Sequence, residues 1–197
     1  ALRRGATGAS ASGLALSIDG KSLPLGALTG MIPSGEPGGG ASADRSGFLS
    51  RLGFFANGKL KRLDLAVGGA PQVLADAPSF RGGAWNSRGV ILFAPGTGTG
   101  LMRVPATGGT PTPVTRLAPS QSTHRWPQFL PDGQHFLFLA GNTATADGDG
   151  IYVGSLDGGE PVRIVTSPQQ PLYAAPDRLL FLRQGVLVVQ SFNPSSL

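Results

Sequence analysis

A short turn between apolar runs returns at an interval of about 44 residues, and this repeat limits the folds open to the chain more than any other feature. The stretch FLPDG ends at Gly133 and the stretch WNSRG ends at Gly89, and in each an aromatic residue stands four positions before the glycine. The stretch AAPDR places Arg178 in the same position, 45 residues after Gly133. Recurrence at such an interval is typical of proteins built from one repeated supersecondary unit.

A second marker, Gly-Gly followed by one residue and a proline, returns with the turns. It begins at Gly68, Gly108 and Gly158, each time after a strand-like segment and before a short apolar run. The unit therefore reads strand, turn, strand, loop, strand, Gly-Gly turn and strand, which is a four-stranded antiparallel meander of the size of one β-propeller blade. In the clearest unit, residues 124–167, the run HFLFLA is continuously apolar, as expected for a strand covered on both faces by neighbouring blades.

The sequence predicts an all-β protein: an incomplete β-propeller with about three recognisable four-stranded antiparallel blades and part of another. The composition agrees, because 31 glycines and 17 prolines supply many turns, and 40% apolar residues are too many for a disordered chain. The expected blades span approximately 51–77, 80–117, 124–167 and 171–197.

Residues 1–50 depart from the repeat. A step of 44 or 45 residues back from Gly89 reaches positions 44–45, where no turn-and-strand unit is found, and the turn LSIDG at Gly20 lies about 25 residues away. The stretch 31–50 is rich in Gly, Pro and Ser and is expected to be a loop. We predict an irregular segment with at most a degenerate partial blade, and an insertion, a decayed blade and a sequence error all remain compatible with it.

Composition argues against several classes of partner and chemistry. Cysteine is absent, which excludes disulfides, thiolate catalysis and cysteine-ligated zinc. The net charge of +5 arises in residues 1–62, which hold eight Lys or Arg against three acidic residues, whereas residues 63–197 hold eight of each sign. We therefore expect no nucleic-acid partner. No apolar run approaches the roughly 18 residues of a membrane span, so none is expected in this chain.

Local motifs predict neither a catalytic site nor a cofactor or metal site. The stretch GTGTG at 96–100 lacks the third glycine and the following helix of a dinucleotide site. The stretch TATADGDGIYVG resembles part of a calcium loop, but Leu156 stands where a bidentate glutamate is required. His124 and His135 are the only histidines, and a hydrogen-bonded structural role is expected for each. Two glutamates, Glu36 and Glu160, suggest no paired-carboxylate site.

The meander does predict a binding face. Alternate connections of a meander lie on the same side, so loops 118–125 and 141–150 of one blade share a side with loops 75–82 and 95–100 of the preceding blade. Recognition residues usually lie on loops, and we expect a protein, peptide or small ligand on this side rather than at the Gly-Gly turns. The residues predicted to line it are Asp76, Arg81, Thr97, Thr99, Ser122, Thr123, His124, Arg125, Asn142, Asp147 and Asp149.

Several segments, taken in their serial order, resemble the TolB-like, WD40-like propeller of bacteria. They include GFFANGKLKRLDL, RGGAWNSRGVILFAP, HRWPQFLPDGQHFLFLAG and IYVGSLDGGEPVRIV, and the resemblance covers residues 51–197 well and residues 13–25 weakly. It is strongest to the version that follows a membrane-anchored, eukaryotic-like serine/threonine protein kinase. This resemblance implies a parent protein with a cytoplasmic kinase domain, a membrane helix and this propeller on the extracytoplasmic, periplasmic side.

The chain itself is expected to be non-catalytic. It lacks a Gly-rich loop followed by a strand lysine, it lacks Asp-Phe-Gly, and HRW at 124–126 lacks the aspartate of a kinase catalytic loop. The first hypothesis is a recognition or sensor module of a receptor-like kinase. The alternatives are a TolB-like scaffold that docks periplasmic proteins and, less favoured, a propeller hydrolase or lyase.

Overall fold

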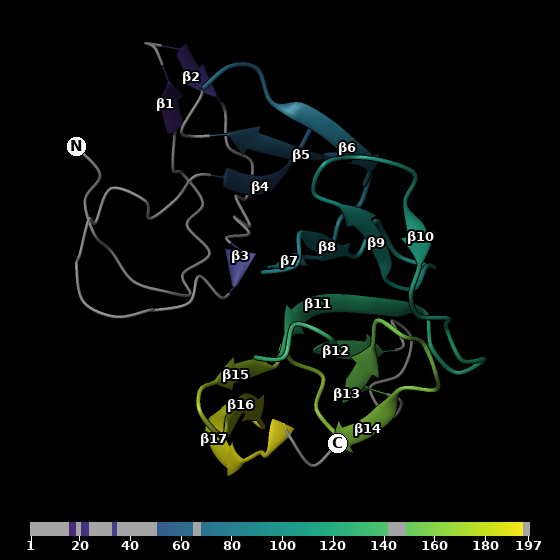
Figure 1. Ribbon diagram of the computed structural model, residues 1–197. Helices are drawn as coiled ribbons and strands as arrows, with labels where there is room; N and C mark the ends of the chain where they lie inside the picture. The colour runs from purple at the N-terminus through teal and green to yellow at the C-terminus, as the bar shows by residue number, and fades with distance from the viewer. Residues whose placement is uncertain are drawn as a thin grey trace, which may run out of the picture.

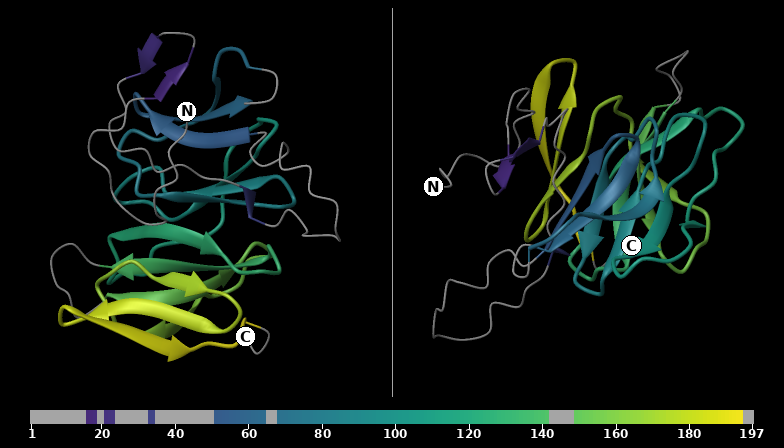
Figure 2. Two further views of the ribbon diagram at one scale, coloured as in Figure 1. Left: turned by 90° about the vertical axis from the view of Figure 1, so that its left-hand side faces the viewer. Right: turned by 90° about the horizontal axis from the view of Figure 1, so that it is seen from above.

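The computed structural model describes residues 51–64, 68–141 and 149–194 and, from the first 50 residues, the backbone of three short strands. These strands are β1 (Leu16–Ile18), β2 (Lys21–Leu23) and β3 (Pro33–Ser34). The described ranges contain no α-helix, and so none that could cross a membrane. Their strands form a separate β1–β2 hairpin and four larger sheets stacked in chain order (Figures 1 and 2). The predicted all-β class is confirmed.

The first sheet contains β4 (Arg51–Ala56), β5 (Lys59–Asp64) and β6 (Gln72–Asp76) in that order. Asn57 and Gly58 join β4 to β5 with φ angles of 54° and 68°, the two positive values that a tight type I′ hairpin turn requires. The Gly-Gly pair precedes β6. By the position of that pair, these strands correspond to the second, third and fourth strands of a blade.

The second sheet is a full meander of β7 (Gly83–Asn86), β8 (Val90–Phe93), β9 (Met102–Pro105) and β10 (Thr112–Pro113). Strand β3 adds to its first edge by pairing in parallel with Trp85 and Asn86. The expectation that 31–50 is only a loop is wrong at this point. The edge of β7 carries unpaired backbone groups, and a short extended segment can satisfy them.

The third sheet contains β11 (Thr123–Phe129), β12 (His135–Gly141), β13 (Gly150–Ser155) and β14 (Val162–Val165). Every residue of β12 from Phe136 onward is buried, as the continuous apolar run predicted. The fourth sheet has three strands, β15 (Leu172–Ala174), β16 (Arg178–Arg183) and β17 (Val186–Ser191), and matches the first three strands of a blade.

Each pair of neighbouring sheets encloses its own apolar core. Phe55 of the first sheet packs with Trp85 of the second, and Leu92 of the second packs with Phe136 of the third. The core between the third and fourth sheets includes Leu139, Ile151, Tyr173, Leu179 and Phe181. The sheets therefore pack face to face as blades do, and no single core spans the described residues.

The turns between the first and second strands of a sheet and the Gly-Gly turns lie together on one side, which we call the turn face. The Ala106 N–H donates to the Gly89 carbonyl at 2.7 Å, and the Leu156 N–H donates to the Gln134 carbonyl at 3.1 Å. In each case the residue two positions before a Gly-Gly pair contacts the turn between the first two strands of its own sheet. The turn face consists of residues 87–89, 106–111, 131–134 and 156–161.

Arginine side chains join neighbouring sheets across the turn face. Arg62 Nη1 donates to the Ala106 carbonyl at 2.6 Å, and Arg103 Nη1 donates to the Leu156 carbonyl at 3.0 Å. Each acceptor stands two residues before a Gly-Gly pair, so the same contact is made in two successive repeats. Hydrogen bonds from a charged donor to a carbonyl are among the stronger kinds. The turn face is thus used for contacts between blades.

Candidate functional site

The connections on the opposite side also lie together, and we call this side the loop face. The Ser79 N–H donates to the Pro95 carbonyl at 3.2 Å, and the Gly98 N–H donates to the Ser122 carbonyl at 2.8 Å. The Ser122 N–H in turn donates to the Gly141 carbonyl at 2.9 Å. Loops 77–82, 94–101 and 114–122 therefore form one surface, as the meander argument expects, and a binding role for this surface remains a prediction.

Some of the side chains predicted to line the loop face are exposed there. Arg81, Thr97 and Thr99 are exposed, and Ser122 and Arg125 are half-buried. Asp76 is exposed as well, but its carboxylate is paired with the Lys59 ammonium across β5 and β6.

Three of the predicted side chains are buried instead. Thr123 and His124 are each 1% exposed because they lie on β11 between neighbouring sheets, and Asp149 is 5% exposed beside Gly141. These three are corrected from surface positions to packed positions. Asn142 and Asp147 lie outside the described residues.

A shallow groove of about 290 Å³ opens on the loop face between the first two of its loops. Thr99 Oγ1 donates to the Gly96 carbonyl at 3.1 Å and so fixes the end of the second loop. The exposed Thr97 hydroxyl and the proline rings give this groove a mixed polar and apolar lining, which suits a peptide better than a charged metabolite. Its lining residues are Pro78, Ser79, Pro95, Gly96, Thr97 and Thr99.

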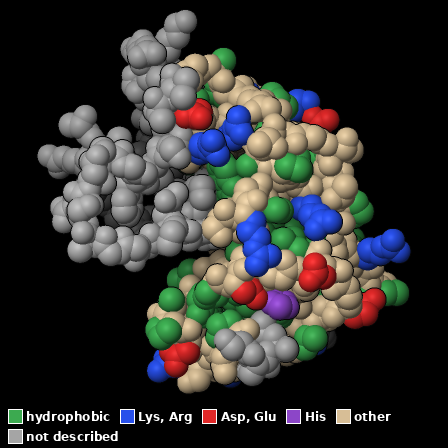
Figure 3. Space-filling view, viewed as in Figure 1, with side chains coloured by type: hydrophobic (Ala, Val, Ile, Leu, Met, Phe, Trp, Pro, Cys, Tyr) green, Lys and Arg blue, Asp and Glu red, His purple; other side chains and the backbone are tan. Residues whose placement is uncertain are grey.

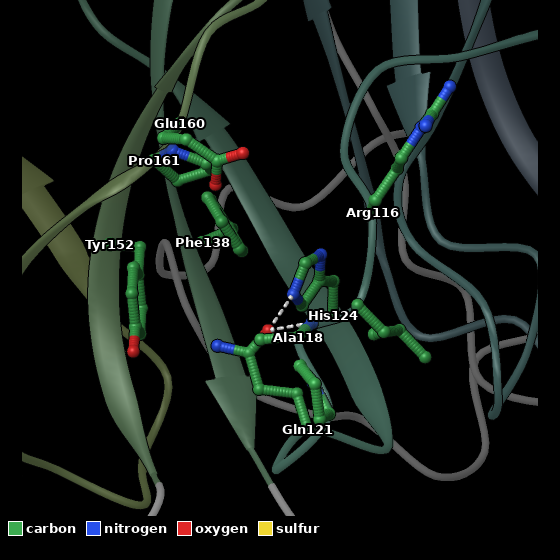
Figure 4. A pocket seen from close by; sticks show the side chains of 10 residues that line it. Arg116, Ala118, Gln121, His124, Phe138, Tyr152, Glu160 and Pro161 are labelled. Atoms are coloured by element: carbon green, nitrogen blue, oxygen red, sulfur yellow. Dashed lines mark hydrogen bonds between the residues drawn. The ribbon is translucent and has the colours of Figure 1, made fainter.

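A second groove of about 350 Å³ lies between the linker 114–121 and strands of the third sheet, and we call it the rim groove (Figure 4). It brings together Arg116, Gln121, Tyr152 and Glu160, none of which was predicted from the sequence. Arg116 and Glu160 are exposed, and Tyr152 is half-buried. No local motif indicates this groove, because its two walls are separated by some 30 to 40 residues of sequence.

His124 reaches the rim groove but is held on both ring nitrogens. The Ala118 N–H donates to Gln121 Oε1 at 2.9 Å, which identifies that atom as the amide oxygen. His124 Nε2 lies 2.9 Å from the same oxygen and must therefore carry the proton (Figure 4). His124 Nδ1 then accepts a hydrogen bond at 2.7 Å from the Thr115 hydroxyl.

This network makes His124 a structural residue. Burial lowers the pKa of its imidazole from 6.5 to about 4, so the ring is neutral at pH 7. With one nitrogen donating to Gln121 and the other accepting from Thr115, the ring has no free lone pair to act as a general base. The expected hydrogen-bonded role of His124 is confirmed.

Lowering the pH from 7 to 4 is expected to cost about 3 kcal/mol of stability through His124 alone. The unfolded chain takes up a proton below pH 6.5, whereas the folded chain does so only near pH 4. This stabilisation is therefore complete above pH 6.5 and is lost as the pH falls to about 4, at about 1.4 kcal/mol per unit. Urea unfolding at several pH values measures it, with His124→Gln as the variant that removes the titration.

The contribution of Asp132 to stability is lost outside the pH range in which His124 acts. Partial burial raises the pKa of its carboxyl, but hydrogen bonds from the His135 ring and from the Gln134 and His135 N–H groups outweigh burial and lower it from 3.8. Its contribution is lost only at more acidic pH. A His124→Gln variant that kept the full pH dependence of the native chain between 6.5 and 4 would contradict the assignment to His124.

His135 lies on the turn face, and its hydrogen bond forms within a single turn. Its Nδ1 is 2.5 Å from Asp132 Oδ2, while Asp132 Oδ1 accepts from the Gln134 and His135 N–H groups at 2.9 Å. Such aspartate-centred turns stabilise a hairpin locally. The expected hydrogen-bonded role of His135 is also confirmed.

Charged side chains of both signs are interspersed over the described surface seen in Figure 3. Among the described residues no group of three or more His, Asp or Glu side chains is placed to hold a metal ion.

Comparison with known proteins supports the fold alone. No model of a known protein family matches the sequence, and no curated protein matches it. The crystal structure of TolB from Acinetobacter baumannii is similar with a TM-score of 0.56 and 13% identity, over 72% of this chain and 38% of TolB. The crystal structure of the tricorn protease is similar with a TM-score of 0.49 and 13% sequence identity. This similarity covers 72% of this chain and 16% of the protease chain.

The similarity to TolB confirms the propeller fold predicted from the repeat. At 13% identity it shows the fold alone. The chain spans 38% of the length of that TolB, and 15 chains of solved structures match in all.

Proposed function

We propose that this chain is a non-catalytic recognition module that binds a protein or peptide partner on its loop face. The main support for this proposal is that the turn face makes contacts between blades, whereas the loop face has exposed side chains and an open groove. The turn face is occupied by arginine contacts between blades, at Arg62 and Arg103. The loop face joins three loops, opens a groove and presents exposed Arg81, Thr97 and Thr99.

Site-specific crosslinking tests which side binds. The chain has no cysteine, so Thr97→Cys on the loop face and Thr107→Cys on the turn face can each carry a single benzophenone label. Both positions are exposed. After illumination with an envelope fraction of the source cells, Thr97→Cys is expected to give a defined covalent adduct and Thr107→Cys is not. An adduct formed only from Thr107→Cys, or equally from both, would overturn the proposal.

We further propose that the module is the extracytoplasmic sensor of a membrane-anchored serine/threonine protein kinase of bacteria. The support is the serial resemblance of segments between 51 and 197 to propellers of that kind. A periplasmic scaffold of the TolB type is the second candidate, and the fold similarity to TolB favours it.

The coding sequence upstream of Ala1 distinguishes the two candidates. A membrane-spanning segment preceded by kinase motifs would support the sensor, and a signal peptide without kinase motifs would support the scaffold. Paired carboxylates or a histidine cluster in further blades would instead favour a propeller hydrolase or lyase.

A further inference from the structure

Arg125, in the first half of β11, is an arginine whose guanidinium has no hydrogen-bond acceptor among the described residues. Its Cζ atom lies 4.5 Å from the centroid of the Trp126 ring, and its side chain is half-buried. The Nε atom is buried and has no hydrogen-bond partner. No carboxylate of the described residues lies within ion-pair distance of it. By contrast, Arg62, Arg88 and Arg103 each donate to an acceptor of the neighbouring sheet.

Trp126, which supports this guanidinium, has an unusual backbone conformation. Its φ of 53° is in the left-handed region, and a β-bulge interrupts the pairing of β11 with β12 between Arg125 and Gln128. For a residue with a bulky side chain this conformation is unfavourable, and surrounding contacts must maintain it. Bulges often redirect side chains beside binding sites.

Contacts with the preceding blade hold Trp126 in place. Its N–H donates to the Arg81 carbonyl at 2.7 Å. Its indole lies on Gly82, where an added Cβ would be 3.1 Å from both Cα and Cδ1 of Trp126. Such contacts are tighter than usual, and the φ of 94° at Gly82 also favours glycine. The stacked pair of Arg125 and Trp126 is thus built from two blades, at the loop face beside the exposed Arg81.

A second polar atom nearby is also unsatisfied. The Thr123 hydroxyl is buried and has no hydrogen-bond partner among the described residues, and Thr123 lies two residues before Arg125, on the same side of β11. Buried donors without acceptors are uncommon in folded proteins, and each needs an explanation such as a water or a ligand that completes the bonding. Guanidinium groups stacked on an aromatic ring are well suited to bind a planar carboxylate through two parallel hydrogen bonds.

We infer that Arg125, positioned by Trp126, binds a carboxylate of the partner, supplied by an acidic side chain or by a chain terminus. This inference rests on the proposed function and specifies the chemistry of the partner at the loop face. Arg81, whose carbonyl accepts from the Trp126 N–H, adds a second exposed positive charge on the loop face, and this favours an acidic segment over a single isolated carboxylate.

Binding of three capped peptides tests the inference. Acetylated, amidated hexaglutamate offers side-chain carboxylates, acetylated hexaglycine with a free terminus offers a terminal one, and acetylated, amidated hexaglutamine offers neither. The chain has two tryptophans, so the indole N–H signals in ¹H–¹⁵N spectra report on Trp126 and on the buried Trp85 separately. We expect hexaglutamate, hexaglycine or both to shift the Trp126 signal, and hexaglutamine to leave it unchanged.

Two variants separate this site from general charge attraction. Arg125→Ala is expected to lower the affinity about tenfold or more, as loss of a charge-assisted contact does, and Arg125→Lys to lower it less. Arg183→Ala is the matched control, because Arg183 also lies over an aromatic ring, with its Cζ 5.2 Å from the Phe181 centroid, but in the fourth sheet. It is expected to change the affinity less than twofold, roughly the limit of a long-range charge effect.

Each outcome of the peptide experiments either supports the inference or contradicts it. A shift by hexaglutamate alone assigns the carboxylate to side chains, and a shift by hexaglycine alone assigns it to the terminus. No shift by either, an equal shift by hexaglutamine, or an equal loss in Arg183→Ala overturns it. If the inference fails while the Thr97→Cys crosslink persists, the recognition role of the loop face stands without Arg125.

Discussion

Replacing Phe138 by alanine is expected to lower the free energy of unfolding by about 3–5 kcal/mol, the usual cost of truncating a buried phenylalanine. Phe138 is 0% exposed in β12. Its ring centroid lies 4.8 Å from that of His124 and 5.7 Å from that of Tyr152, and Leu101, in the loop before β9, belongs to the same core. Such a loss is a large part of the 5–15 kcal/mol that is typical of whole domains.

Urea unfolding followed by far-ultraviolet circular dichroism measures this loss. The control is Val162→Ala on β14 of the same sheet, where the side chain is 64% exposed and truncation should change stability by less than about 0.5 kcal/mol. Equal stabilities of the two variants would contradict the packing of the second sheet against the third.

The chain is expected to self-associate, or to unfold with low cooperativity, through the uncovered face of its fourth sheet. Leu179 and Phe181 of β16 face the third sheet and are buried. The alternate residues face the other way, and the strand pairing places residues of β15 and β17 on the same side. We call this side the open face; its members are Leu172, Leu180, Leu182, Leu187 and Val189.

The open face resembles a surface that a blade would cover. Leu182, Leu187 and Val189 are 41%, 60% and 57% exposed. The corresponding face of the third sheet, which includes Leu139 and Ile151, is equally apolar and is buried by the fourth sheet. A contiguous apolar surface on a strand sheet favours association with another sheet.

Sedimentation velocity over a wide range of concentrations measures the association. Leu187→Lys combined with Val189→Lys is expected to make the chain monomeric, whereas Val73→Lys, at a position 53% exposed on β6, is not. A longer chain that supplies one more blade is expected to be monomeric too, with a steeper urea transition. A native chain that is monomeric at all concentrations, unfolds sharply and gains nothing from the added blade would refute this expectation.

Local chemistry explains which features the sequence predicted correctly. The turn residues Asn57, Gly58, Gln184 and Gly185 have the positive φ angles that their hairpins need. The buried run of β12 follows from its unbroken apolar composition. Both kinds of signal are contained within a few neighbouring residues, so a single sequence is enough to detect them.

The binding role of the predicted site residues remains a prediction, and only the placement of their loops follows from connectivity. The meander places loops 77–82, 94–101 and 114–122 on one side regardless of their side chains, and Arg125 was included among the candidates for that reason. The burial of Thr123 and His124 could not be predicted in the same way, because it depends on how other parts of the fold pack on the two faces of β11.

The sequence by itself determined the repeat, the strands and hairpin turns of residues 51–194, and which connections share a side, because these follow from short-range turn chemistry and alternating connectivity. Only the tertiary structure decided the parallel pairing of β3 with β7, the rim groove and the stacking of Arg125 on Trp126 above Gly82. Each of these joins residues about 30 to 50 positions apart. Contacts over that distance depend on the packing of one blade on the next, which no local pattern of residues specifies.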